Sequence, residues 1–163
     1  MIVTTHRDLL SADAEALVNP VNTVGVMGRG LALQFKRTHP ANYRAYRDAC
    51  AAGQVRLGEM LIFDSGKPGR GRYVINFPTK GHWRNQARLD DIRRGVDSLV
   101  DTVIGHRIGS IAVPALGCGL GGLEWSDVRP VIECAFAPLP DVRVLLFPPQ
   151  ADRAGTAQTD RAH

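Results

Sequence analysis

The run Thr79-Lys-Gly-His-Trp-Arg84 gathers the side chains of this chain that are best suited to chemistry. Lys80 could act as a nucleophilic amine or as a proton donor if burial or neighbouring cations lower its pKa. Without further context, such a lysine is more often only a solvated charge. Trp83 and Arg84 form a pair that is common in nucleic-acid binding, because the indole stacks on bases and the guanidinium holds phosphates. Core packing would account for Trp83 equally well.

Two glycine-rich turns are the second feature that could bind a ligand. The first covers residues 25–30 and the second Gly117–Gly122, and each follows an apolar stretch and precedes a helical one. Glycine lets the backbone turn sharply and approach a ligand closely, and a helix start offers unpaired amide donors to an anion. Two such corners in one small domain predict a pinched site for a diphosphate-bearing ligand. The alternative is that both are merely tight turns.

Familiar nucleotide and catalytic motifs lack their usual context. The second turn formally matches the dinucleotide pattern Gly-x-Gly-x-x-Gly, but the following strand ends in Phe147-Pro-Pro instead of an acidic residue. The first turn lacks the Gly-Lys-Ser/Thr ending of an NTPase loop. The five histidines are scattered, so we expect no metal. Cys118 is better explained as a small residue in a tight turn than as a catalytic thiol. Glu124 is the only carboxylate close to the second turn, which disfavours catalysis by paired carboxylates.

Strands and helices alternate along most of the chain, as in a mixed or mostly parallel sheet between helices. The predicted strands cover residues 2–4, 16–21, 59–63, 73–77, 110–116 and 142–147. Helices are predicted from Leu31, from Pro40, from Leu89 and after an N-cap at Ser126. Ligands of such folds bind beyond the carboxyl ends of the strands. Both glycine turns and the run that contains Lys80 follow strands, so we expect all three to meet at one edge of the sheet.

The composition is that of one globular domain with a basic balance. The chain has 163 residues, of which 44% are hydrophobic and 22% charged, and its formal net charge is +4. This charge permits a nucleic-acid partner without requiring one. No apolar run reaches the roughly 20 residues of a membrane span, and no signal peptide is recognisable. We therefore expect a cytoplasmic monomer without membrane contact. Residues 1–149 would form the domain, and residues 150–163 a flexible tail or linker stub.

The order of these segments resembles the macrodomain, an ADP-ribose-binding module, over residues 1–149. The matching segments are Asp8-Leu9, Ala16-Leu-Val-Asn-Pro-Val-Asn22, the first glycine turn, and Pro114-Ala-Leu-Gly-Cys-Gly119. The resemblance implies an α/β fold, a three-layer α/β/α arrangement with a central mixed sheet. Residues 22–36 together with residues 76–84 are more specific. They resemble the DarG-type DNA ADP-ribosyl glycohydrolases, antitoxins to a toxin that ADP-ribosylates thymidine in single-stranded DNA.

The resemblance implies a glycosidase-type hydrolase that releases ADP-ribose from thymidine bases, with Lys80 and Asn22 as catalytic residues. Lys80 would attack or protonate at the anomeric carbon, and Asn22 would hold the distal ribose. Asp8 would accept a hydrogen bond from the adenine amino group, assisted by the Leu9 amide. The complete set of implied ADP-ribose-binding residues is Asp8, Leu9, Asn22, Val26, Met27, Gly28, Gly30, Leu116, Gly117, Cys118, Gly119, Leu120 and Gly121. The DNA itself would contact His82, Trp83 and Arg84.

Two other functions are compatible with the same residues. The protein could hydrolyse ADP-ribosyl esters on protein Glu or Asp side chains or O-acetyl-ADP-ribose, or it could bind ADP-ribose without turnover. A related vertebrate glycohydrolase carries an acidic residue in the second glycine turn, where this chain has Gly121, which disfavours a lysine–aspartate mechanism. No cofactor is expected, since ADP-ribose would be ligand and product. Expected partners are ADP-ribosylated single-stranded DNA and a DNA ADP-ribosyltransferase toxin.

Overall fold

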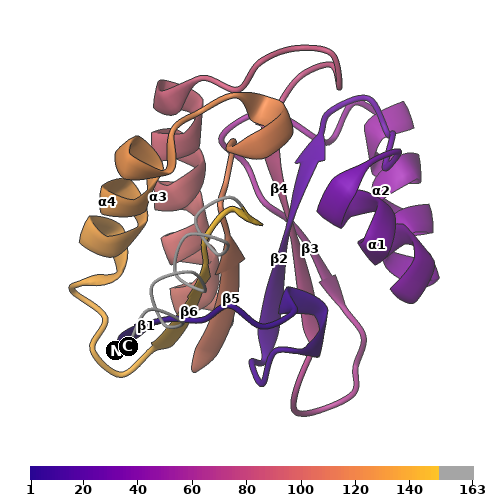
Figure 1. Cartoon of the computed structure of the whole chain (residues 1–163). Coiled ribbons are helices and arrows are strands. Elements are labelled where there is room, and N and C mark those ends of the chain that lie inside the picture. The colour runs from indigo at the N-terminus through magenta and orange to yellow at the C-terminus, as the bar shows by residue number, and fades with distance from the viewer. Residues whose placement is uncertain (151–163) are drawn as a thin grey trace.

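The computed structural model describes residues 1–150, and these residues form three layers (Figure 1). The strands are β1 (Ile2–Thr4), β2 (Ala16–Asn22), β3 (Leu61–Asp64), β4 (Tyr73–Lys80), β5 (Ser110–Pro114) and β6 (Arg143–Phe147). The α-helices are α1 (Gly30–Thr38), α2 (Pro40–Ala51), α3 (Leu89–Gly105) and α4 (Trp125–Phe136). Two 3₁₀ turns, η1 (Leu9–Ser11) and η2 (Gly119–Gly121), complete the elements. The predicted tail lies outside the described residues, apart from Gln150.

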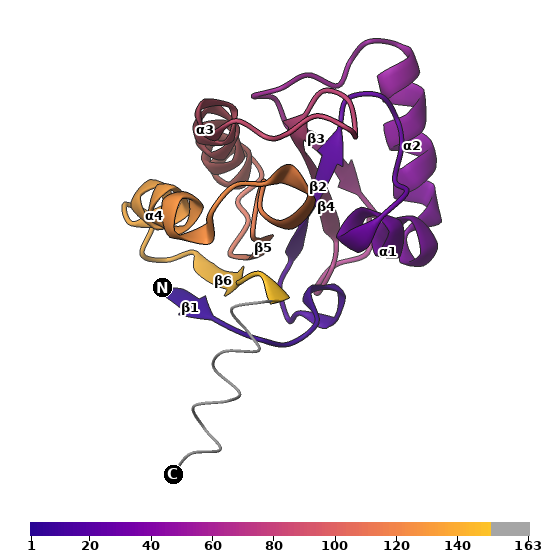
Figure 2. The same ribbon diagram turned by 45° about the horizontal axis from the view of Figure 1, so that its top comes forward.

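The strands form one mixed sheet in the order β1-β6-β5-β2-β4-β3. All neighbouring pairs are parallel except β3 and β4, which are antiparallel and are joined by the loop of residues 65–72. Helices α1 and α2 cover one face of the sheet, and α3 and α4 cover the other (Figures 1 and 2). The expected α/β/α layering with a central mixed sheet is therefore confirmed.

Side-chain alternation along the strands builds a separate core on each face. On β2, Ala16 and Val18 pack into the core under α3 and α4, whereas Leu17 and Val21 pack toward α1 and α2. Because helices cover both faces of the sheet, the sequences of the central strands are mostly continuous apolar runs instead of alternating apolar and polar residues. This is why the sequence marks these strands so clearly.

Helix α3 packs very closely on β4 through a glycine. A Cβ atom added at Gly95 would lie 2.3 Å from Cζ of the buried Phe77. Since real Cβ atoms do not approach other atoms so closely, only glycine fits there without a shift of the aromatic ring. Gly95 thereby sets the distance between the helix and the strand that carries Lys80 at its end.

Three fully buried asparagines join the sheet to α2. Asn19 and Asn76 are register partners on β2 and β4, and Asn19 Nδ2 donates to Asn76 Oδ1 over 3.2 Å. Asn76 Nδ2 donates to Asn42 Oδ1 over 2.8 Å and to the Leu61 carbonyl over 3.1 Å. Asn42 Nδ2 in turn donates a hydrogen bond to Asn76 Oδ1. Buried amides are costly unless they are paired, so this cluster fixes α2 against one position of the sheet.

Several predicted boundaries are wrong, among them the start of β3, which lies at Leu61 instead of Glu59. Helix α4 begins at Trp125, with Glu124 instead of Ser126 at the N-cap position. Strand β5 ends at Pro114, because the chain turns there and the Leu116 amide bonds the Pro114 carbonyl. Strand β4 continues beyond Phe77 to Lys80. Pro78 has no N–H for a sheet ladder, which is why the sequence suggests an end there.

Candidate functional site

A cleft of about 1210 Å³ lies at the carboxyl ends of the parallel strands, where ligands of open α/β sheets bind. Its walls come from η1, the end of β2, the first glycine loop (residues 23–29), the start of α1, Lys80, the second glycine loop (residues 115–122) and the end of β6. Both glycine turns and the run that contains Lys80 therefore meet at one edge of the sheet, as the sequence predicts. The cleft is large enough for a nucleoside diphosphate with a second sugar.

The side chain of Asn22 organises the first glycine loop. Its Oδ1 accepts from the Val24 and Val26 amides over 3.1 and 3.3 Å, and its Nδ2 donates to the Val26 carbonyl over 2.7 Å. The loop turns at Gly25 with a φ of +89°, a value that favours glycine. Asn22 thus holds the loop backbone from inside the turn, and the residue is buried, with 6% of its surface exposed.

Tyr46 of α2 supports the same loop from behind. Its hydroxyl lies 2.7 Å from the Asn22 carbonyl oxygen and 2.8 Å from Asn22 Oδ1. Burial raises the pKa of the Tyr46 phenol well above its usual range, so the group stays protonated and can donate. Burial also raises the pKa of the neighbouring Cys50 thiol, whose Cβ lies 3.5 Å from a Cβ placed at Gly25. Helix α2 therefore forms a rigid support for the loop.

The first loop ends at the amino terminus of α1. Gly30, Leu31 and Ala32 line the cleft there, and no side chain caps the first turn of the helix. The first amides of a helix lack intrahelical acceptors and carry the positive end of the helix dipole. The first turn of α1 also holds no acidic residue. This corner can accept an anionic group.

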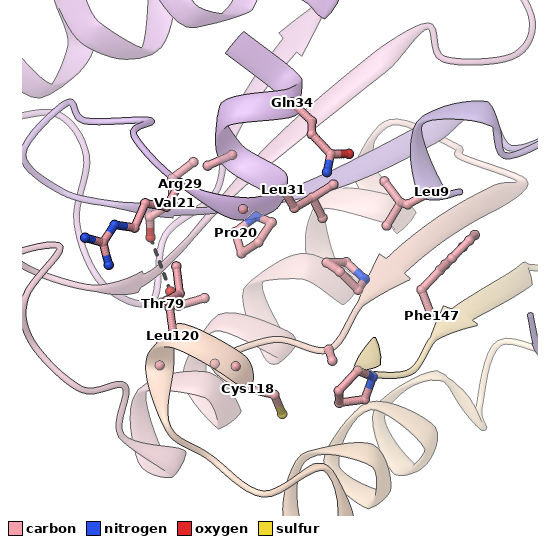
Figure 3. Close-up of a pocket in the computed structure, with 18 of the residues that line it drawn as sticks. Leu9, Pro20, Val21, Arg29, Leu31, Gln34, Thr79, Cys118, Leu120 and Phe147 are labelled. Atoms are coloured by element: carbon pink, nitrogen blue, oxygen red, sulfur yellow. Dashed lines mark hydrogen bonds between the residues drawn. The ribbon is translucent and has the colours of Figure 1, made fainter. Parts of the chain in front are cut away.

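The second glycine loop is tightly packed and bends sharply. Gly117 has a φ of +74°, and a Cβ added there would lie 2.7 Å from Leu123 Cδ1. The loop closes on itself, since the Leu123 amide donates to the Gly117 carbonyl over 2.9 Å. Leu120 reaches across toward the first loop, and its Cδ1 lies 3.9 Å from a Cβ placed at Gly30 (Figure 3). The two glycine loops thus narrow the cleft between them.

The segment Gly81–Arg88 ties the two glycine loops together. The Gly81 carbonyl accepts from the Thr23 amide over 2.9 Å, next to the first loop. At its other end the Ala87 amide donates to the Gly121 carbonyl over 2.9 Å. A Cβ at Gly121 would lie 3.1 Å from Ala87 Cβ, so the second loop has little room for a larger side chain at this position.

Lys80 is the last residue of β4 and lines the cleft. The sequence places it on a loop, but β4 carries it as the register partner of Asn22. A strand holds a side chain more rigidly than a loop does. Lys80 is half-buried, and burial lowers the pKa of its ammonium group. A larger share of neutral amine is therefore available at a given pH than in an exposed lysine.

The opposite end of the cleft combines a carboxylate with apolar surface. Asp8 caps η1, and its Oδ1 accepts from the Leu10 amide over 3.2 Å. Leu9 packs in the same apolar cluster as Phe147, and both lie at the end of the cleft that is remote from Leu120 (Figure 3). Among the described lining residues Asp8 is the only carboxylate. A flat apolar ring with a polar edge would suit this end.

Most of the predicted site residues line the cleft, and three do not. Met27 is buried among Val21 and the α2 side chains, and Leu116 is fully buried in the core under α3 and α4. His82 lies outside the cleft and stacks on Trp83 with ring centroids 5.0 Å apart. Trp83 and Arg84 both line the cleft, and the Arg84 guanidinium lies 4.6 Å from the centre of the Trp83 ring.

Several lining residues have no counterpart in the sequence-based prediction. Apart from Gln34, they lie at the ends of parallel strands or in the segments that follow them: Arg7, Arg29, Gln34, Thr79, Pro114 and Phe147. The rule that ligands bind at the carboxyl ends of strands could have pointed to Phe147, the last residue of β6. Gln34 could not be found in this way, because it enters the cleft from the second turn of α1. In residues 1–150 no three His, Cys, Asp or Glu side chains gather in a group that could hold a metal ion, and no helix there has the length and apolar character to cross a bilayer.

Comparisons with known proteins agree with this architecture. The family model of the Macro domain matches residues 18–132. A Mycobacterium tuberculosis protein described as a DNA ADP-ribosyl glycohydrolase is 48% identical over 91% of this chain and 42% of its own length. A Thermosipho africanus protein, described as a DNA ADP-ribosyl transferase–DNA ADP-ribosyl glycohydrolase fusion, is 33% identical over 93% of this chain and 42% of its own length. This chain thus spans about two fifths of the length of these two relatives.

One solved structure matches this chain over nearly the whole length of both chains. The macrodomain of Mycobacterium tuberculosis DarG superimposes with a TM-score of 0.89 at 48% identity, and the match covers 91% of this chain and 98% of that one. The family model covers β2 from Val18 to most of α4, and the sequence and structure matches extend over 91% of this chain. The chain belongs to the Macro domain family.

Proposed function

We propose that this chain is a DNA ADP-ribosyl glycohydrolase that releases ADP-ribose from thymidine in single-stranded DNA, with Lys80 as the catalytic group. The observation that carries the proposal is the position of Lys80. This half-buried amine is held by strand β4 beside Asn22, in a cleft that both glycine loops line. The similarity to proteins described as DNA ADP-ribosyl glycohydrolases supports the choice of substrate.

The shape and polarity of the cleft suggest how ADP-ribose lies in it. Adenine occupies the end with Leu9 and Phe147, where Asp8 Oδ2, which makes no hydrogen bond within residues 1–150, accepts from the exocyclic amino group. The diphosphate lies against the amino terminus of α1 and the amides of the two glycine loops. The distal ribose then reaches Asn22 and Lys80.

The surroundings of Lys80 favour a covalent mechanism over activation of water by carboxylates. Glycosidases of the usual kind need two carboxylates about the scissile bond, whereas Asp8 is the only carboxylate among the described lining residues and lies at the adenine end. The lowered pKa of Lys80 increases the fraction of nucleophilic amine. The amine attacks the anomeric carbon and the bond from that carbon to the thymine nitrogen breaks. Thymine leaves with the electron pair and takes up the proton released from the new ammonium centre. Water then cleaves the lysine–sugar bond, which returns the free amine and ADP-ribose.

The similarity to a transferase–glycohydrolase fusion protein suggests the partner. We infer that a DNA ADP-ribosyltransferase supplies the modified thymidine that this site consumes. This chain matches 42% of the length of that fusion protein, which leaves room for a transferase outside the matched part. Binding of purified transferase to this chain tests the inference directly.

The decisive experiment offers two substrates to one preparation. An oligonucleotide ADP-ribosylated on thymidine and a protein ADP-ribosylated on Glu or Asp are incubated separately with the parent protein and with Lys80→Ala. Rapid release of ADP-ribose from the oligonucleotide by the parent alone is the expected result. Equal rates for parent and Lys80→Ala contradict the mechanism. Turnover of the protein substrate alone supports ester hydrolysis, and tight ADP-ribose binding without any turnover supports a reader. Lys67→Ala, in the exposed β3–β4 loop, is the matched control.

A further inference from the structure

The excess positive charge of this chain is concentrated in one part of the fold. Residues 29–51 hold five of the 20 Lys and Arg residues but only one of the 16 Asp and Glu residues. This segment covers α1 and α2 with the residue that precedes them. It therefore carries a formal charge of +4, which is the net charge of the chain, and the remaining residues hold fifteen charges of each sign.

The helices on the other face of the sheet have the opposite balance. Helix α3 contains four acidic and two basic residues, and α4 contains two acidic residues and one basic residue. Since the two pairs of helices lie on opposite faces (Figures 1 and 2), the molecule has a basic side and an acidic side. The cleft opens at the edge of the sheet between them. A polyanion that enters the cleft is drawn toward the α1–α2 side.

On the basic side, the aromatic ring of Tyr43 packs against two cationic side chains. Lys36 Nζ lies 4.6 Å and Arg47 Cζ lies 5.8 Å from the centre of the Tyr43 ring, within the range of cation–π contacts. Arg47 follows Tyr43 by four residues and Arg44 by three, so each of them shares a side of α2 with Arg47. Arg44 is exposed and forms no ion pair within residues 1–150. We name Lys36, Tyr43, Arg44 and Arg47 the α1–α2 basic surface.

This surface continues directly into the candidate site. The Cα and Cγ atoms of Arg47 lie 3.9 and 4.0 Å from a Cβ placed at Gly25, so Arg47 packs against the outside of the first glycine loop. Arg29 lines the cleft immediately before α1. Cations thus extend from the cleft mouth, past the first glycine loop, onto the outer side of α2. Phosphates that are spaced along a single strand could follow such a row.

We propose that the α1–α2 basic surface binds the sugar–phosphate backbone of single-stranded DNA that flanks the modified nucleotide. The proposal rests on the proposed function, because the modified base must enter the cleft for the strand to lie there. It assigns the affinity for the strand to phosphate contacts, which carry no sequence information. The modified thymidine in the cleft then provides the selectivity, and the flanking sequence has little influence on turnover.

Binding of unmodified DNA tests the surface apart from catalysis. A labelled single-stranded oligonucleotide is titrated with parent protein, with Arg44→Glu/Arg47→Glu and with Lys36→Glu/Arg44→Glu, the last of which leaves the contact of Arg47 with Gly25 intact. Both double variants are expected to bind at least tenfold more weakly. The slope of log K against log salt should also fall by about 1.4, because each phosphate contact on a single strand contributes about 0.7. Unchanged affinity and unchanged salt dependence in both variants overturn the proposal.

The control moves the same charge change to the acidic side. Arg93→Glu/Arg129→Glu replaces two arginines of α3 and α4 whose side chains are 58% and 47% exposed, against 56% for Arg47. This variant should retain most of the parent affinity. An equal loss in the control variant would mean that net charge alone drives binding, and that result also overturns the proposal. Loss of transferase binding with intact DNA binding would instead identify a protein interface.

Turnover of two substrates separates this proposal from the proposed function. ADP-ribosyl-thymidine as a nucleoside has no flanking phosphates, whereas a modified oligonucleotide has many. The double variants should hydrolyse the nucleoside at the parent rate but show a raised KM for the oligonucleotide. If the parent protein hydrolyses neither substrate, the proposed function fails, and the binding titration still decides whether the surface holds single-stranded DNA.

Discussion

Asn22 lies beside Lys80 in the sheet because a bulge separates the last two pairs of the β2–β4 ladder. Val21 pairs with Pro78 and Asn22 pairs with Lys80, so Thr79 is the extra residue on β4. Bulges redirect side chains and are common next to active sites. A regular ladder would place Thr79 beside Asn22 instead. The bulge therefore brings the residue that holds the first glycine loop next to the candidate catalytic amine.

The lowered pKa of Lys80 predicts how activity depends on pH. Only the neutral amine can attack the anomeric carbon, so kcat should rise with pH and level off as Lys80 loses its proton. Burial lowers this pKa from the ordinary value of 10.5, and the midpoint of the rise should therefore fall below that value. Rates measured under saturating substrate over a series of buffers check this. A rate that falls with pH over the same range would identify Lys80 as a proton donor instead.

Chemical trapping gives an independent check on the same lysine. If the amine forms a bond to the sugar, the ribose ring of the adduct can open, which converts the glycosylamine to an imine and frees the ring oxygen as a hydroxyl. Borohydride should reduce that imine to a stable secondary amine and leave the reduced ADP-ribose attached to Lys80, which mass spectrometry of peptides would locate. Lys80→Arg should give no adduct and lose nearly all activity, because the guanidinium stays protonated. An adduct on Lys67 or Lys36 at the same level would show that trapping is nonspecific.

The Tyr46 hydroxyl should matter for ligand binding although it does not line the cleft. Tyr46→Phe removes the group that contacts the carbonyl and side-chain oxygens of Asn22, and the loss of a typical intramolecular hydrogen bond costs about 0.5–1.5 kcal/mol. We expect the free energy of unfolding to fall by that amount and ADP-ribose to bind more weakly, because the first glycine loop loses its support. Denaturant unfolding and calorimetry measure the two effects.

Tyr43→Phe is the matched control for this change. Tyr43 also lies on α2, is half-buried, and its hydroxyl forms no hydrogen bond within residues 1–150. Its substitution should leave stability and ADP-ribose affinity close to the parent values. If Tyr46→Phe behaves like Tyr43→Phe, the loop does not depend on α2, and Asn22 alone holds it.

Alanine substitutions at two glycines of the second loop distinguish the effect of backbone strain from the effect of side-chain packing. Both Gly117 and Gly119 have positive φ values, so alanine at either position strains the backbone. A Cβ at Gly117 would also meet Leu123 at 2.7 Å and Ala87 at 3.1 Å, whereas nothing lies within 4 Å of one at Gly119. Gly117→Ala should therefore lower both thermal stability and ADP-ribose affinity more than Gly119→Ala. Equal effects would show that only the φ angle matters.

The sequence identifies the fold well because the physical signals are local. Apolar runs mark the strands that are buried on both faces, and Pro40 marks the start of α2. Prediction from the sequence fails where a contact between residues distant in the sequence determines the end of a strand or the position of a side chain. Pro78 suggests that β4 ends at Phe77, but pairing with β2 extends the strand to Lys80. Met27 lies within the glycine-rich turn, yet its apolar side chain is buried against Tyr46 instead of facing a ligand.

The buried asparagine cluster shows a second kind of limit. Nothing local indicates that Asn19, Asn42 and Asn76 meet, since they are separated by 23 and 34 positions in the sequence and lie on three different elements. An asparagine alone is usually expected at the surface or in a turn. Only the register of β2 with β4 and the placement of α2 bring the three amides together.

Gly95 allows a sharp test of how α3 is held against the strand that carries Lys80. Alanine is the better helix former by about 1 kcal/mol, but its Cβ would lie 2.3 Å from Phe77 Cζ. Overpacking of a well-packed core costs about 1–3 kcal/mol, so Gly95→Ala should lower the free energy of unfolding despite the gain in helix propensity. Gly105→Ala, at the end of the same helix with no atom within 4 Å of the added Cβ, should be neutral or slightly stabilising. Because Phe77 precedes Lys80 by three residues on β4, a ring displaced by Gly95→Ala should also reduce kcat on the modified oligonucleotide. Loss of stability with an unchanged kcat would mean that the bulge at Thr79 isolates the end of the strand from the core below it.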